Sequence, residues 1–77
     1  MHIELISFGK ISEIIGNRSL EVTGVTSTDE LIGFLEKNFP ELAGVKYKLA
    51  LNKTLVQSNI DIKEQDVIAI MPPFSGG

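Results

Sequence analysis

One stretch of the chain repeats its apolar residues with the period of a helix. In TSTDELIGFLEKNFPEL, residues 26–42, Leu31, Phe34 and Leu35 lie three and four positions apart. Ile32 widens this apolar stripe, and the charged residues between its members are left to face water. The period therefore predicts an amphipathic helix that packs one face against a core.

End signals in the sequence set the bounds of this helix. Ser27 followed three residues later by Glu30 forms a capping box, in which a hydroxyl and a carboxylate satisfy backbone amides at a helix start. Gly33 weakens the helix only slightly. Pro40 disfavours helical geometry at the residue before it. We therefore predict a helix that is capped by Ser27 and ends at about Asn38.

Shorter runs rich in β-branched residues predict strands before and after the helix. Asn52 and Lys53 are typical of a tight turn between two of these strands. The stretch KISEIIG, residues 10–16, predicts a short helical turn that is closed by Gly16. The predicted strands cover residues 2–8, 19–23, 47–52, 54–57 and 66–71.

The first and last predicted strands differ from the others because apolar residues, Phe8 among them, point to both of their faces. Strands covered on both sides are typical of the interior of a sheet with a parallel pair. A parallel connection requires a crossover, and the capped helix is the one element long enough to supply it. Residues 1–71 thus predict an α+β domain of the ubiquitin-like β-grasp type, with a mixed sheet, parallel first and last strands and one crossover helix.

Composition limits the classes of protein to which the chain could belong. Its 77 residues are enough for one domain, and a net charge of −3 without any basic run disfavours a nucleic-acid partner. Cysteine is absent, which excludes disulfides, thiolate nucleophiles and sulfur ligands for metals. We see neither a leader peptide nor a spanning segment, so we expect a cytoplasmic protein without a membrane partner.

Candidate catalytic residues are few. His2 is the only histidine, and no nucleophile accompanies it in the sequence. Asp61, Glu64 and Asp66 cluster before the last strand, where a solvated turn explains them better than acid–base catalysis does. We therefore expect no enzyme activity from the chain on its own, and no bound cofactor or metal.

The last seven residues, MPPFSGG, carry the chemical hypothesis. Residues 72–77 follow a central strand directly, and the paired prolines favour a stiff, extended path that projects about 20 Å from the domain. Gly76 and Gly77 have no β carbon, so they could enter a narrow channel and present an unhindered carboxylate. We interpret residues 72–77 as a projecting tail, with Gly77 as its reactive residue. Gly76, which has no side chain, would allow the tail to pass through the narrow channel.

Ordering glycines in a channel costs roughly 1 to 2 kcal/mol per residue, and these residues cannot recover that cost by packing. Apolar side chains beside them could offset it, since full burial of one such side chain contributes about 1.5 to 3 kcal/mol. We therefore expect the preceding residues of the tail to bind a partner, with Phe74 as the main anchor. The predicted partner-binding residues are Met71, Pro72, Pro73, Phe74 and Ser75.

A terminal carboxylate becomes reactive once it is joined to AMP, because AMP is a good leaving group. A sulfur nucleophile could then displace AMP and leave a thiocarboxylate at Gly77, a sulfur donor made without cysteine. Partner proteins would recognise the folded domain, and the tail would carry the sulfur that is transferred.

The sequence resembles the MoaD-like group, the small subunits of molybdopterin synthase, within the MoaD/ThiS sulfur-carrier family. The run LALNKTLVQSNIDIKEQDVIAIMPPFSGG carries most of the resemblance, and FGKISEIIG and the capped helix fit the same pattern. The resemblance implies that an E1-like (MoeB-like) adenylyltransferase activates Gly77 with ATP and that a persulfide supplies sulfur. It also implies that the tail inserts into a large (MoaE-like) synthase subunit, where the sulfur builds the dithiolene of molybdopterin.

The chain departs from the family at Phe74, which is bulkier than the aliphatic residue common at the anchor position, so the partner's pocket would be larger. Two other functions share the same fold and tail. One is a sulfur carrier for thiamin synthesis or tRNA thiolation, although thiazole carriers usually lack the pair Pro72 and Pro73. The other is a ubiquitin-related modifier that is joined to lysines of other proteins through Gly77.

Overall fold

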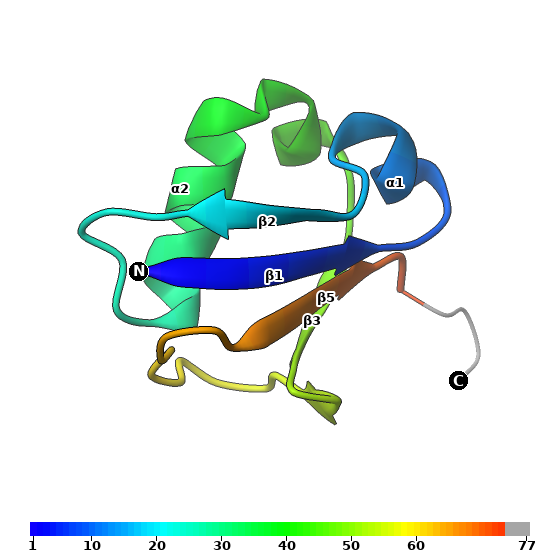
Figure 1. The fold of residues 1–77 in the computed structure, drawn as a ribbon. Coiled ribbons are helices and arrows are strands. Elements are labelled where there is room, and N and C mark those ends of the chain that lie inside the picture. Colours follow the sequence, from blue (N-terminus) through cyan, green and yellow to red (C-terminus); the bar gives the residue numbers. More distant parts are fainter. Residues whose placement is uncertain (74–77) are drawn as a thin grey trace.

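The computed structural model describes residues 1–73, which fold into a mixed five-stranded sheet with helices packed on one of its faces (Figure 1). The order of the strands is β2-β1-β5-β3-β4. In chain order the elements are β1 (His2–Ser7), α1 (Lys10–Ile14), β2 (Arg18–Glu21), α2 (Thr28–Asn38), the 3-10 helix η1 (Pro40–Gly44), β3 (Lys48–Leu51), β4 (Thr54–Leu55) and β5 (Val67–Met71).

The first and last strands lie side by side in parallel at the centre of the sheet, as predicted. Leu5 is paired with Ile68, and Ser7 with Ile70. The pairs β1–β2, β3–β5 and β3–β4 are antiparallel. This topology, with α2 crossing one face, confirms the predicted α+β, ubiquitin-like β-grasp fold (Figure 1).

The prediction that β1 and β5 are covered on both sides is wrong. Their inner side chains are buried beneath the helices, whereas Ile6 and Ala69 on the outer face are only half-buried. Phe8, which follows β1, is 50% exposed. The helices form a single layer, so nothing in the described chain covers the outer face. The buried inner-face residues of these strands are Ile3, Leu5, Ser7, Ile68 and Ile70.

Helix α2 has the predicted length, and its cap differs in one detail. The amide of Glu30 donates to Oγ of Ser27 at 3.4 Å, as in a capping box. The carboxylate of Glu30 accepts from the amide and the hydroxyl of Thr26, one residue earlier than the box requires. Leu31 and Leu35 are fully buried, which confirms the predicted apolar face.

Differences elsewhere are small. Asn52 and Lys53 have φ values of 48° and 74°, so the predicted tight turn between β3 and β4 is confirmed. Strand β4 ends at Leu55 rather than at residue 57. Helix η1 is absent from the sequence prediction: Pro40 signals the end of α2, but proline also suits the first turn of a new helix.

Candidate functional site

The tail begins where the two central strands end. Because β1 and β5 are parallel, their last residues meet at one edge of the sheet. The amide of Phe8 donates to the carbonyl of Ile70 at 3.1 Å, so the pairing continues one residue past β1. Met71, the last residue of β5, is held from the other side by its pairing with Lys48. The segment that leaves β5 therefore starts from a fixed point.

Gly9 and Pro72 are in close contact at this point. A β carbon built on Gly9 would lie 3.1 Å from Cγ of Pro72, and Gly9 has a φ of 59° and a ψ of −139°. These dihedrals are open to glycine and costly for other residues. The carbonyl of Gly9 also accepts from the amide and the hydroxyl of Ser12. The turn between β1 and α1 thus forms a fixed support for the first residue of the tail.

Part of the predicted site lies within the described chain. Met71 and Pro72 are half-buried, and Pro73 is exposed. The remaining predicted site residues, Phe74, Ser75, Gly76 and Gly77, lie outside the described residues.

The outer face of the sheet adds residues that sequence reasoning missed. Phe8 follows the buried Ser7, so alternation turns its side chain to the outer face, and it is 50% exposed. Leu55 is paired with Ala50 in the adjoining strands and is 42% exposed. These are the two large, exposed apolar residues of the described chain. Together with the half-buried side chains beside them they form the outer-face patch: Ile6, Phe8, Leu55, Ala69 and Met71.

His2 lies far from the tail along the sheet. It begins β1, whereas the tail leaves from the end at which β1 and β5 stop. Nε2 of His2 lies 2.8 Å from a carboxylate oxygen of Glu21, and Nδ1 lies 3.6 Å from one of Glu64. The same carboxylate of Glu21 accepts from the Met1 ammonium, which lowers the pKa of that carboxyl and raises the pKa of the amine. These contacts form an exposed cluster of polar and charged groups on the surface.

Residues 1–73 offer little other chemistry. No group of three or more potential ligands could hold a metal ion there. None of the helices in that range is both long and apolar enough to cross a membrane. Burial and a hydrogen bond to Glu36 raise the pKa of Tyr47, which keeps that phenol neutral rather than activating it.

Comparison with known proteins shows the family of the chain. The model of the ThiS family matches residues 5–77, a range that includes both terminal glycines. The molybdopterin synthase sulfur carrier subunit of Arabidopsis thaliana is 28% identical over 81 residues, covering 100% of this chain and 84% of that protein.

Two solved structures share the fold over their whole length. A chain from the complex of subunits 1 and 2 of molybdopterin-converting factor of Helicobacter pylori 26695 is 32% identical, with a TM-score of 0.71 and 100% of both chains covered. SAMP1 from Haloferax volcanii has a TM-score of 0.76 at 19% identity, also with 100% of both chains covered, which is a likeness of fold alone. The chain therefore belongs to the ThiS family, the MoaD/ThiS group of sulfur carriers that its sequence resembles.

Proposed function

We propose that this protein is the sulfur carrier subunit of molybdopterin synthase and that Gly77 carries the transferred sulfur as a thiocarboxylate. The observation that carries this proposal is the match, across the whole chain, to a molybdopterin synthase sulfur carrier and to a subunit of molybdopterin-converting factor. The scarcity of other chemistry in residues 1–73 supports it. On its own the chain would be a carrier without catalytic activity.

Activation would take place on a partner enzyme. The carboxylate of Gly77 attacks the α-phosphorus of ATP, which releases pyrophosphate and leaves an acyl-adenylate. The terminal sulfur of a persulfide then attacks the acyl carbon, and AMP departs with the electron pair. A thiol reductant cleaves the resulting acyl disulfide, so that the thiocarboxylate forms as the thiol is oxidised to a disulfide. An E1-like adenylyltransferase and a persulfide donor are the partners that these steps require.

Sulfur delivery would take place on the large synthase subunit. Gly76 and Gly77 would enter its active site, where the thiocarboxylate sulfur would bond to a carbon of the precursor as the carbon–oxygen bond there breaks, which gives a thioester to Gly77. Water would then cleave this thioester, so that the sulfur stays on the precursor as part of the dithiolene and Gly77 returns to a carboxylate. The large subunit would supply the catalytic side chains, as the likeness to a molybdopterin synthase sulfur carrier and to a subunit of molybdopterin-converting factor implies.

The outer-face patch and the tail together would form the docking surface. Phe8 and Met71 are adjacent where the tail starts, and Leu55 extends the apolar area across β3 and β4. Beyond them Pro73 and Phe74 would anchor the tail, with Ser75 leading into the channel. Aromatic and aliphatic anchors around a central contact are the usual source of binding energy in protein interfaces.

A second function is favoured by one observation. SAMP1, whose fold this chain shares, is a small archaeal modifier protein. In that role the activated Gly77 would be attacked by the amine of a lysine on another protein, and an isopeptide bond would replace the bond to AMP. The identity of 28% and 32% to molybdopterin proteins, against 19% to SAMP1, favours the sulfur carrier.

Intact mass spectrometry of the protein purified from its native cell tests the proposal. We expect a fraction whose mass shows one oxygen exchanged for sulfur, confined to the C-terminal peptide. Addition of the large subunit and cyclic pyranopterin monophosphate should discharge that fraction and yield molybdopterin. Conjugates that resist thiol reagents, without any thiocarboxylate, would favour the modifier. Sulfur that passes only to a thiazole or a tRNA would favour another carrier pathway.

A further inference from the structure

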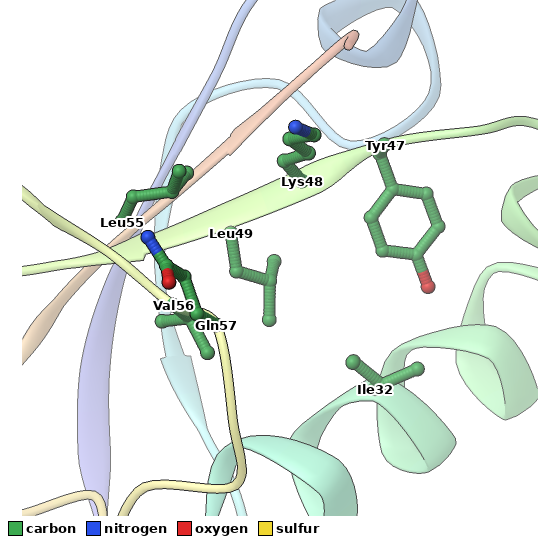
Figure 2. A pocket seen from close by; sticks show the side chains of 7 residues that line it. All are labelled: Ile32, Tyr47, Lys48, Leu49, Leu55, Val56 and Gln57. Carbon is green, nitrogen blue, oxygen red and sulfur yellow. The ribbon is translucent and has the colours of Figure 1, made fainter.

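An apolar groove lies between β3 and α2, and it is separate from the tail. Its lining comes from Ile32 on α2, from Tyr47 and the first two residues of β3, Lys48 and Leu49, and from residues 55–57. Its volume is about 380 Å³. Figure 2 shows Leu49 and the ring of Tyr47 pointing toward the helix that carries Ile32. The hydroxyl of Tyr47 donates to Glu36 at 2.6 Å, which holds the ring in place as one wall of the groove.

The groove borders an unfinished edge of the sheet. The amide of Val56 donates to the carbonyl of Leu49 at 2.8 Å, and this bond ends the pairing of β3 with the β4 segment. Tyr47, two residues before Leu49, turns its peptide groups to the same side. Within residues 1–73 no hydrogen bond reaches the amide or the carbonyl of Tyr47. The amide and the carbonyl of Tyr47, just before β3, are therefore open to pairing with one more strand.

The side chains along this edge indicate which residue types an added strand would have at its alternate positions. Side chains of an added strand would alternate, one set over Leu49, Tyr47 and Ile32 in the groove and the other beside Lys48 on the outer face. Figure 2 shows Lys48 pointing away from the helix, opposite to Leu49. Lys48 is exposed and makes no ion pair with any residue that the structure describes. The edge thus matches apolar residues in one set and acidic residues in the other.

We propose that this groove binds an extended segment of a partner protein in which apolar and acidic residues alternate. The segment adds a strand to β3 by pairing with Tyr47, inserts its apolar side chains above Leu49 and Ile32, and places a carboxylate beside Lys48. Main-chain hydrogen bonds give affinity in this mode of recognition, and the groove gives sequence preference. The site does not use Gly77, and of the outer-face patch it shares only Leu55.

The test is a titration of the full-length protein, followed by NMR, with acetylated and amidated heptapeptides that alternate Glu with Val, Ile or Phe. We expect shifts centred on Tyr47, Leu49 and Ile32, and slower hydrogen exchange at the amide of Tyr47. The matched control peptide carries an N-methyl group on the amide that faces the carbonyl of Tyr47. It should bind at least about tenfold more weakly, because one partner of that bond is lost.

Variants separate the outcomes. Lys48→Glu should weaken peptide binding about fivefold, whereas Lys63→Glu, an exposed lysine outside the groove, should leave it unchanged. Equal binding of the N-methylated peptide, shifts centred on Phe8 and Met71, or no binding by any peptide of the set would overturn the proposal. Concentration-dependent dimers with a protected Tyr47 amide would also overturn it, since the occupant would then be a second copy of this chain.

Discussion

Gly9 and Pro72, 63 positions apart in the chain, meet at the point where the tail leaves the sheet. The left-handed φ of Gly9, 59°, lets the backbone pass so close to the proline ring that a β carbon there would lie 3.1 Å from it. The contact joins the turn after β1 to the first residue after β5. The contact fixes the position at which the C-terminal segment starts. Neither of the two residues has a reactive side chain.

Gly9→Ala should therefore destabilise the protein and displace Pro72. A β carbon adds a close contact to a backbone conformation that costs of order 1 to 3 kcal/mol for residues other than glycine. Urea unfolding measures the loss in the free energy of unfolding. The matched control is Gly33→Ala, a helix-interior site with nothing within 4 Å of the added atom, which should gain up to about 1 kcal/mol. Equal stability of the two variants would show that the Gly9 turn is not constrained.

Phe8→Ala should weaken binding of the large synthase subunit while leaving the fold intact. The side chain is 50% exposed, so its removal costs little in the core, whereas burial in an interface would make it an anchor. We expect a loss of affinity of more than about fivefold by calorimetry, with a thermal midpoint close to that of the parent protein. Lys37→Ala on the exposed side of α2 serves as the control, and affinity unchanged by Phe8→Ala would remove the outer-face patch from the interface.

Deletion of Gly77 should abolish sulfur transfer and leave stability unchanged. Within residues 1–73 the buried apolar core lies between Ile3 and Ile70, and we expect removal of a terminal glycine, which has no side chain, to take little from it. Intact mass spectrometry after incubation with the activating enzyme, ATP and a persulfide donor should show no sulfur on the shortened chain. The thermal transition measured beside it separates this loss from unfolding. A shortened chain that unfolds would mean that the end of the chain is structural.

The fold was predictable where local signals agree. The period of three and four around Leu31 and Leu35, together with the cap at Ser27, gave α2 because helix formation depends on residues close in the sequence. The apolar runs at both ends of the domain led to the parallel pair β1–β5 because a crossover helix lies between them.

The open outer face could not be predicted in the same way. Apolar residues on both faces of a strand indicate either a second covering layer or a surface for a partner, and the two give the same local sequence. The nearness of Phe8 to Met71 depends on the register of the parallel strands, which joins residues far apart in the chain. The contact of Gly9 with Pro72 is of the same kind. Residues 74–77 were assigned from the sequence and the family, and they stay predictions.

The cap of α2 makes stability depend on pH through Glu30. Hydrogen bonds from the amide and the hydroxyl of Thr26 favour the ionised carboxylate and lower the pKa of Glu30 in the folded state. A lowered folded pKa stabilises the protein above the unfolded pKa of about 4.3, and this contribution is lost as pH falls through the folded value. Glu30→Gln should therefore reduce the free energy of unfolding at pH 7 and converge with the parent protein near pH 2. Urea unfolding across this range measures both curves, with Glu13→Gln on α1 as the control for removal of an exposed charge. If Glu30→Gln lowers the free energy of unfolding by the same amount at the lowest pH, then the shape of the Glu30 side chain, rather than its charge, stabilises the start of the helix.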